Sequence, residues 1–357
     1  MGKLLYPLLF ENNLHQTVWG GERIAQWKKL DAESVKDVSP IGESWEVSAV
    51  TSSPCVIANG FLKGKTLEEA VAELPEEILG KAVAKEYNNK MPLLAKFIDA
   101  RNDLSIQVHP DDEMAQREHG KMGKTEMWYV IDAPLGSSLY SGFSKQLSPE
   151  EYSRCVADGT IIDYLARHEL RTGDVFYIPA GRIHAIGGGV LLAEIQQSSD
   201  VTYRVYDYNR PGLDGKQRQL HTELAAQALD FTVNDNYMTE YSQKASHANK
   251  CVDSEYFSVR VVDLHAPFHR NLKKYDSFII TMCTRGSCTI RIRQTGDEIS
   301  LREGYSCLIP ASIADYDVIP QSKKVQILDA FIDSRKQNFL HRLFRKLPPF
   351  RSRALRA

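Results

Sequence analysis

The chain has 357 residues, of which 43% are hydrophobic and 25% charged, and its formal net charge at pH 7 is -2. This length allows two domains with full cores. The near-neutral charge excludes a strongly basic nucleic-acid-binding protein and a highly acidic disordered chain. No apolar run approaches the roughly 20 residues that span a bilayer.

Two features of the sequence indicate a cytoplasmic protein. The N-terminal apolar run in MGKLLYPLLFENN is interrupted by Pro7 and is too short for a signal peptide. The six cysteines are scattered without any C-x-x-C pair, so we expect reduced thiols and no disulfide framework. We therefore expect a cytoplasmic monomer or dimer that binds neither nucleic acid nor membrane.

The first third of the chain mixes strand and helix signals. Short apolar runs separated by turn residues predict irregular β structure over residues 4–62. Residues 66–88 predict two helices, because Thr66 and Glu69 form a capping-box pattern and Pro75 divides the helical spacing that follows. Strand signals then return.

A second helical insert is predicted from Ser148, with Pro149 at the first helical position, toward Leu170, and another helix after Thr222. Between these inserts, strand patterns such as VLLAEIQQ and VTYRVYDYN alternate with turns. Many short strands and few helices predict a β-sandwich or barrel rather than a parallel α/β sheet.

The second half contains an internal repeat of the first. Residues 302–315 align without a gap to residues 171–184, and both segments share R-x-G, apolar positions and Ile-Pro-Ala. Asp315 stands at the position of His184, and no Q-x-H pattern precedes it. We therefore expect the mostly strand-like residues 254–332 to form the same kind of barrel without a metal.

We divide the chain into a metal-binding domain (1–245), a second barrel without metal (246–333) and a basic tail (334–357). The tail has apolar residues at helical spacing, namely Phe339, Leu340, Leu343, Phe344 and Leu347. Three interpretations of the tail stay open: a short amphipathic helix packed on the body, a disordered segment, or a contact with an anionic partner.

The strongest functional pattern lies in the first half. Strand-like alternation over residues 104–109 puts Gln107 and His109 on one face, and Glu126 begins the strand-like run EMWYVI. These side chains converge if the two strands are neighbours, and His184 follows a Pro-Ala-Gly turn further on. A single histidine is more often an ordinary buried side chain. The combined spacing indicates a divalent metal with nitrogen and oxygen ligands, with zinc favoured and iron possible.

Five motifs resemble those of the type I phosphomannose isomerases in their short bacterial form: GESWEVS at 42–48, LLAKFIDA at 93–100, SIQVHP at 105–110, GKTEMW at 123–128 and AEIQQSSDVTYR at 193–204. The resemblance extends to about residue 330. It implies a mainly β fold of two cupin-like jelly-roll barrels with small helical inserts. It also implies one Zn2+ per chain and an isomerase that interconverts mannose 6-phosphate and fructose 6-phosphate.

The resemblance further implies roles for individual residues. Arg204 matches the family's active-site arginine, and Asp200 matches an acid assigned to ring opening. The implied zinc ligands are Gln107, His109, Glu126 and His184. The implied substrate-pocket residues are Lys96, Ser105, Lys124 and Glu194.

The cationic side chains can also be judged from the sequence alone. Lys124 lies two residues before Glu126, so strand alternation would point both side chains into one cavity; the alternative for each lysine is a solvated surface charge. Arg204 with Lys96 or Lys124 would bind a phosphate. The alternative for Arg204 is a structural ion pair with Asp200.

The isomerisation moves a proton between C2 and C1 through a cis-enediolate, whose negative charge a metal can stabilise. The proton-transfer base stays open between Lys124, Glu194, Asp200 and a water molecule at the metal. An Fe(II) cupin dioxygenase is an alternative enzyme, although Gln107 as an extra ligand leaves less room for oxygen. A sugar-binding bicupin without catalysis is the non-enzymatic alternative.

Overall fold

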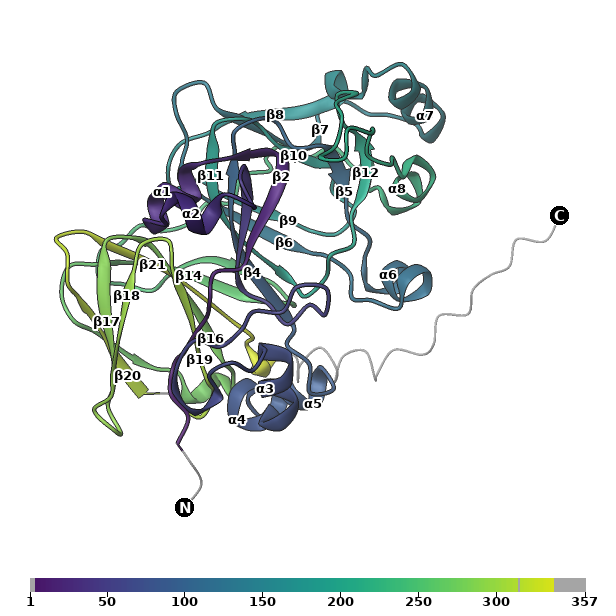
Figure 1. Ribbon diagram of the computed structural model, residues 1–357. Coiled ribbons are helices and arrows are strands. Elements are labelled where there is room, and N and C mark those ends of the chain that lie inside the picture. Colours follow the sequence, from purple (N-terminus) through teal and green to yellow (C-terminus); the bar gives the residue numbers. More distant parts are fainter. Residues whose placement is uncertain (1–3, 314, 337–357) are drawn as a thin grey trace.

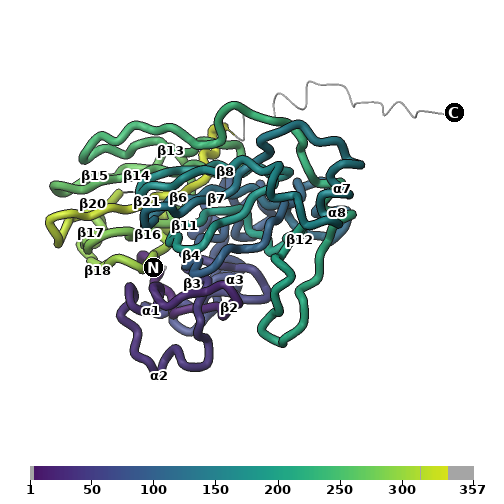
Figure 2. Tube along the Cα trace, turned by 90° about the horizontal axis from the view of Figure 1, so that it is seen from above, coloured from purple at the N-terminus to yellow at the C-terminus, as the bar shows by residue number. Residues whose placement is uncertain are grey.

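The computed structural model describes residues 4–313 and 315–336. It is mainly β, with two barrels of antiparallel strands and short helices around them, as predicted (Figure 1). Seen from above in Figure 2, the light green and yellow strands of the second barrel lie beside the blue and teal strands of the first. Among the described helices, none has the length and apolar character needed to cross a membrane.

The first barrel is built from two sheets. Sheet I has six strands in the order β2 (Leu14–Gly21), β3 (Ile41–Val47), β4 (Leu93–Ala100), β11 (Val190–Gln197), β6 (Glu126–Asp132) and β9 (Val175–Ile178). Sheet II has five strands in the order β12 (Tyr203–Tyr206), β5 (Ile106–Val108), β10 (His184–Ile186), β7 (Ser138–Phe143) and β8 (Leu165–Glu169).

Sheet I is buried on both faces, and strand alternation assigns its side chains to two different cores. Ile98 and Trp128 pack with Ile186 of sheet II and fill the interior of the first barrel. Phe97 and Tyr129, one position away in sequence, belong to a larger core shared with the second barrel. Because successive side chains point to opposite faces, even-numbered residues of β4, β6 and β11 face the interior of the first barrel.

The second barrel also has two sheets. Sheet III has the order β1 (Leu8–Leu9), β19 (Ser306–Ile309), β16 (Ile279–Arg285), β21 (Val325–Phe331), β14 (Ser258–Leu264) and β13 (Asn249–Asp253). Sheet IV has the order β15 (Phe268–Asn271), β20 (Asp315–Pro320), β17 (Ser287–Ile292) and β18 (Glu298–Arg302). The N-terminal strand β1 pairs with β19, so the start of the chain contributes to the sheet of the second barrel.

The repeated sequence segments occupy matching places in the two barrels. In the first barrel, the segment runs from β9 through the Pro-Ala-Gly turn into β10, which begins at His184. In the second barrel, it runs from β19 into β20, which begins at Asp315. The structure places the repeat as the alignment predicted, whereas the division of the chain at residue 245 stays a prediction.

The helices are short and lie outside the barrels: α1 (Arg23–Lys28), α2 (Ala32–Val35), α3 (Leu67–Glu73), α4 (Pro75–Leu79), α5 (Lys81–Glu86), α6 (Asp112–His119), α7 (Pro149–Ala157) and α8 (Thr222–Ala228). The predicted capping boxes form at Thr66 before α3 and at Ser148 before α7. The helix predicted after Thr222 is α8, which begins at Thr222 itself.

Two helix predictions were wrong in their extent. Residues 66–88 form three helices, since Gly80 at a φ of 90° separates α4 from α5 in addition to the break at Pro75. The insert from Ser148 ends at Ala157, and residues 165–169 form β8 because they pair with β7. Helix α6 was not predicted.

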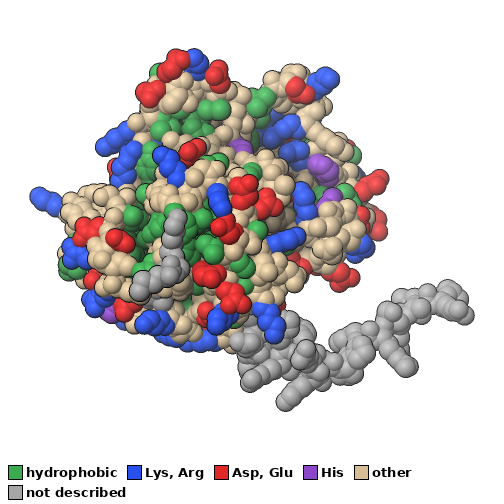
Figure 3. Space-filling view, turned by 60° about the horizontal axis from the view of Figure 1, so that its bottom comes forward, with side chains coloured by type: hydrophobic (Ala, Val, Ile, Leu, Met, Phe, Trp, Pro, Cys, Tyr) green, Lys and Arg blue, Asp and Glu red, His purple; other side chains and the backbone are tan. Residues whose placement is uncertain are grey.

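Acidic and basic side chains are interspersed over the face seen in Figure 3, as expected for a chain of net charge -2. All six cysteines are free and buried, so the prediction of reduced thiols is confirmed. Residues 337–357, which hold most of the predicted basic tail and its helical pattern, lie outside the described residues.

Candidate active site

Three of the four predicted metal ligands, His109, Glu126 and His184, meet inside the first barrel, but their strands are arranged differently from the expectation. β5 and β6 are not neighbouring strands: β5 lies in sheet II and β6 in sheet I. The side chain of Glu126 reaches His109 and His184 across the barrel interior. The interpretation of adjacent strands was therefore wrong, because strand alternation fixes the face of a strand and not its partner.

Three donor groups form a compact buried cluster. The ligand atoms of His109, Glu126 and His184 all lie within 4.8 Å of one another. Glu126 Oε2 lies 3.3 Å from His109 Nε2, and Glu126 Oε1 lies 3.4 Å from His184 Nε2. All three side chains are buried. Among the described residues this is the one such cluster found.

The hydrogen bonds of the two imidazoles direct one nitrogen of each ring into the cluster. Nδ1 of His109 lies 3.1 Å from the Val201 carbonyl, and Nδ1 of His184 lies 2.8 Å from the Arg182 carbonyl. If each Nδ1–H donates to its carbonyl, each Nε2 keeps a lone pair for a metal. Burial lowers the pKa of His184, and burial followed by the Lys124 charge lowers the pKa of His109 to about 3, so both shifts favour the neutral imidazole that a metal requires.

The cluster fits a cation. Lys124 Nζ lies 2.8 Å from Glu126 Oε2 and 2.9 Å from His109 Nε2. Its ammonium therefore occupies a position between two of the donors that a metal ion could take. Glu126 Oε1 and His184 Nε2 are buried without hydrogen-bond partners. Buried polar atoms without partners are costly unless another group satisfies them, and a divalent metal would do so.

Gln107 is the fourth predicted ligand. It is the direct cross-strand partner of His184 and, on its other side, of Arg204. Its side chain lines the cavity that the cluster adjoins. Its position supports the predicted role as a ligand, which stays a prediction.

A cavity of about 340 Å³ opens beside the cluster and brings together most of the predicted site residues. The predicted residues that line it are Lys96, Ser105, Gln107, Lys124, Glu194, Asp200 and Arg204. The remaining lining residues are Thr17, Trp19, Glu43, Ile98, Leu104, Ile186, Thr202, Arg218 and His221.

Carboxylates and lysines pair along one wall of the cavity. Lys96 Nζ lies 3.0 Å from Glu194 Oε1 and 3.3 Å from Glu43 Oε2. Burial would lower the pKa of Lys96, but the charges of Glu194 and Glu43 outweigh it and raise that pKa. The pKa of Glu194 is raised by burial and by the neighbouring charge of Glu126. Glu194 is therefore the carboxyl of this wall whose pKa is shifted toward neutrality.

Asp200 and Arg204 stand at another part of the cavity. Asp200 pairs with Lys121 at 2.5 Å. Burial raises the pKa of Asp200, but the hydrogen bond and charge of Lys121 outweigh it and lower that pKa. Arg204 donates through Nη1 to the Gln219 carbonyl at 2.8 Å, while its Nε is buried without a partner. No ion pair joins Asp200 to Arg204 among the described contacts, so the alternative of a structural pair has no support.

Sequence reasoning missed three charged or titratable residues of the cavity. Glu43 lies in the GESWEVS motif, which could have indicated it as a site residue. Its carboxylate accepts a hydrogen bond of 2.6 Å from Trp45 Nε1. Arg218 and His221 lie in an irregular segment between β12 and α8, where no periodic pattern indicates which way a side chain points.

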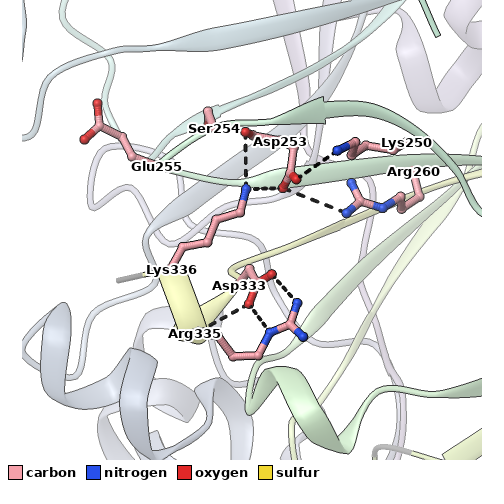
Figure 4. Close-up of a pocket in the computed structure, with 8 residues that line it drawn as sticks. All are labelled: Lys250, Asp253, Ser254, Glu255, Arg260, Asp333, Arg335 and Lys336. Atoms are coloured by element: carbon pink, nitrogen blue, oxygen red, sulfur yellow. Dashed lines mark hydrogen bonds and ion pairs between the residues drawn. The ribbon is translucent and has the colours of Figure 1, made fainter. Parts of the chain in front are cut away.

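A larger hollow lies elsewhere and lacks the donor cluster. It measures about 840 Å³ and lies on the second barrel. Figure 4 shows that most of its charged side chains pair with one another: Asp253 contacts Lys250, Arg260 and Lys336, and Asp333 contacts Arg335 at 2.6 Å. Most of these charges are already paired within the protein and no donor cluster adjoins them, so size alone does not make this hollow the site of chemistry.

Comparison with known proteins gives the family. Residues 8–130 match the family model of the phosphomannose isomerase type I catalytic domain, and residues 247–325 match the mannose-6-phosphate isomerase cupin domain. The mannose-6-phosphate isomerase of Streptococcus mutans is 32% identical over 311 residues, which are 87% of this chain and 94% of that protein. The probable mannose-6-phosphate isomerase GmuF of Bacillus subtilis is 34% identical over 318 residues, covering 88% and 96%.

A solved structure agrees with these relatives. The crystal structure of mannose 6-phosphate isomerase from Bacillus subtilis aligns with a TM-score of 0.80 at 29% identity, over 91% of this chain and 99% of that chain. These relatives give no support to the dioxygenase alternative. The chain belongs to the type I phosphomannose isomerase family.

Proposed function

We propose that the chain interconverts mannose 6-phosphate and fructose 6-phosphate, with one zinc ion bound by Gln107, His109, Glu126 and His184. The observation that carries this proposal is the buried His-Glu-His cluster beside a cavity that also holds Lys96, Glu194 and Arg204. Two imidazoles, a carboxylate and an amide oxygen suit zinc. A bound metal would supply a Lewis acid that stabilises negative charge on the substrate oxygens.

Glu194 is our candidate for the group that moves the proton between C1 and C2. It is 3% exposed, lines the cavity and faces the barrel interior from β11, beside the strand that carries Glu126. A carboxyl whose pKa is raised transfers protons near neutral pH more effectively than an ordinary one. The Trp128 indole N–H donates a hydrogen bond of 2.8 Å to Glu194 Oε2, which fixes the orientation of the Glu194 carboxyl group.

The other candidate bases are less suited to this step. Lys124 pairs as an ammonium with the Glu126 carboxylate, and an ammonium has no lone pair to accept a proton. Asp200 is held by Lys121 and has a lowered pKa, which makes it a weaker base. We assign Asp200 to ring opening, and Lys96, Ser105 and Lys124 to contacts with the sugar oxygens. Arg204, with a buried Nε that lacks a partner, would bind the phosphate.

A coupled assay tests the proposal. The purified chain should convert mannose 6-phosphate to fructose 6-phosphate, lose this activity after chelation and regain it when zinc is added back. Unphosphorylated mannose is the matched substrate control and should react far more slowly. A zinc-loaded, folded chain that leaves mannose 6-phosphate unchanged refutes the proposed function and favours a sugar-binding protein.

We also propose that the protein works in the cytoplasm. Its cysteines are free and buried, and burial raises the pKa of Cys251 to about 12, so this thiol stays protonated and unreactive. Cell fractionation followed by detection of the chain tests the location. Recovery in a secreted or periplasmic fraction would contradict it.

A further inference from the structure

Three loops that are distant in sequence meet at the carboxylate of Asp200. Asp200 lies in the loop that follows β11, and it accepts a hydrogen bond of 2.5 Å from Lys121 Nζ and one of 3.3 Å from Ser52 Oγ. Lys121 lies in the loop that follows α6, and Ser52 lies in the loop that follows β3. The carboxylate is therefore held by an ammonium and a hydroxyl from two other parts of the first barrel.

Asp200 is shared by two hollows. It lines the cavity of about 340 Å³ that adjoins the donor cluster. It also lines an outer hollow of about 350 Å³, together with Lys121, His119 and Tyr203. Lys121 lines this outer hollow but not the inner cavity. The ammonium therefore approaches Asp200 from outside and leaves the cavity side of the carboxylate for a substrate.

The loop that carries Lys121 is fixed against the loop that carries Asp200. Gly120 ends α6 at a φ of 64°, a left-handed conformation that glycine adopts without strain, and Lys121 follows directly. The carbonyl of Met122 accepts a hydrogen bond of 2.8 Å from Ser199 Oγ, and Ser199 directly precedes Asp200. The two loops are thus joined beside the ion pair as well as through it.

Lys121 is the charge that pairs with Asp200. Burial raises the pKa of Asp200, but the hydrogen bond and charge of Lys121 outweigh it, and the Ser52 hydroxyl lowers that pKa further. The other charged or titratable residues that line either hollow are Glu43, Lys96, Lys124, Glu194, Arg204, Arg218, His119, Tyr203 and His221. Within the part of the chain that the structure describes, none of these forms an ion pair with Asp200. The ionised state of this carboxyl therefore depends on Lys121.

We propose that Lys121 is a positioning residue for ring opening, which holds the Asp200 carboxylate ionised at the wall of the cavity. This inference rests on the proposed function, in which Asp200 opens the sugar ring. Lys121 acts through Asp200 and not on the substrate, because it lies in the outer hollow. A carboxylate held by an ammonium and a hydroxyl keeps one orientation, and proton transfer requires such a fixed geometry.

Ring opening moves one proton between two oxygens of the sugar. Asp200, as a carboxylate, takes the proton of the hydroxyl on C1 of mannose 6-phosphate while the bond from C1 to the ring oxygen breaks and C1 becomes an aldehyde carbon. The proton then passes from the carboxyl to the former ring oxygen, which becomes the hydroxyl on C5, and the carboxylate is restored. Fructose 6-phosphate opens by the same steps at C2. A protonated carboxyl cannot begin this sequence, so its ionised state decides the rate.

The test compares a substrate that must open its ring with one that has no ring. Fructose 6-phosphate is cyclic, whereas 5-deoxyfructose 6-phosphate lacks the hydroxyl that closes the ring and stays open-chain. Initial rates of the zinc-loaded full-length chain are measured with both substrates. We expect Lys121→Gln to lower kcat/KM for fructose 6-phosphate by about 2- to 5-fold, as for the loss of a partly exposed ion pair. The value for the 5-deoxy substrate should stay unchanged, and Lys121→Arg should restore the rate with fructose 6-phosphate.

The pH profile separates this role from a structural one. Without the Lys121 charge the pKa of Asp200 rises, so the acid limb of kcat/KM for fructose 6-phosphate should move to higher pH in Lys121→Gln. The acid limb for the 5-deoxy substrate should not move. Lys65→Gln is the matched control, since Lys65 forms an exposed ion pair with Glu73 of α3, and it should leave both profiles unchanged.

Three outcomes would overturn the inference: equal losses with the two substrates, an acid limb that does not move, or a loss in Lys121→Arg as large as that in Lys121→Gln. If the wild type converts neither substrate, the proposed function fails. The contact is then tested by ¹³C NMR titration of the Asp200 carboxyl, assigned with Asp200→Asn. This carboxyl should titrate at higher pH in Lys121→Gln than in the wild type, and an unchanged titration refutes the role of Lys121.

Discussion

Glu194 in β11 and Trp128 in β6 are direct cross-strand partners, and the Trp128 indole N–H donates to Glu194 Oε2 over 2.8 Å. Glu194 Oε1 faces Lys96 Nζ at 3.0 Å. The carboxyl is thus held from both sides inside the barrel. A general base needs this fixed orientation because proton transfer depends steeply on geometry.

The first prediction concerns this carboxyl. Glu194→Gln keeps the size of the side chain and removes its ability to accept a proton, so we expect kcat to fall by about 10²- to 10⁴-fold with little change in KM. Asp200→Asn, at the group paired with Lys121, should have a smaller effect on kcat. Steady-state kinetics with mannose 6-phosphate measures both. A Glu194→Gln variant with at least a tenth of the wild-type kcat assigns the proton transfer to another group.

The second prediction concerns metal retention. His109→Ala and His184→Ala each remove a nitrogen from the buried cluster and should abolish both bound zinc and turnover. The matched control is Asp315→Ala, since Asp315 begins β20 as His184 begins β10, yet it pairs with His269 at 2.7 Å outside any such cluster. Metal analysis of the purified variants measures the outcome. Full zinc content in either histidine variant would contradict the proposed ligand set.

The donor cluster could be predicted because each pattern that indicates it lies within a short stretch of sequence. The alternation of Gln107 and His109, and the spacing of Lys124 and Glu126, fix which side chains share a face. The partner of each strand is not local. The sequence therefore could not reveal that β5 and β6 belong to different sheets, although the convergence of their side chains was foreseen.

The misjudged elements depend on tertiary contacts. Residues 165–169 follow α7 and continue its helical pattern, but pairing with β7 makes them a strand, since packing partners outweigh intrinsic propensity. α6 has Asp111 as its N-cap and Gly120 at its end, which are usable signals, yet its sequence carries few apolar residues. Lys121 and Asp200 meet from two irregular loops, and no sequence rule brings such residues together.

The third prediction arises from a buried ion pair in the second barrel. Asp329 is the cross-strand partner of Thr281, which donates to its Oδ1 at 2.7 Å, as Trp128 donates to Glu194 in the first barrel. Arg270 Nη2 binds the other oxygen at 2.6 Å. The second barrel thus holds a buried pair of a guanidinium and a carboxylate.

Arg270→Met should lower the free energy of unfolding by about 3–5 kcal/mol, because it leaves the Asp329 carboxylate buried without its counter-charge. Arg293→Met is the matched control: its exposed pair with Asp317 should contribute about 0–1 kcal/mol. Adding Asp329→Leu to Arg270→Met should recover part of the loss. Urea denaturation measures each variant, and an Arg270→Met variant as stable as wild type would show that the pair contributes nothing.

The fourth prediction is the response of stability to acid. Burial lowers the pKa of His168 below its ordinary value of 6.5, while its ring lies 3.3 Å from the Ser141 carbonyl. The unfolded chain therefore binds a proton near pH 6.5 that the folded chain does not. The contribution of neutral His168 to stability is complete above this pH and is lost as the pH falls toward the folded pKa.

We expect Tm to decrease between about pH 7 and pH 5, and to decrease less in His168→Gln, which cannot titrate. Thermal unfolding of both chains across this range is the measurement, with His265→Gln, a histidine of the second barrel, as the control. An identical slope in wild type and His168→Gln would show that His168 does not couple folding to pH.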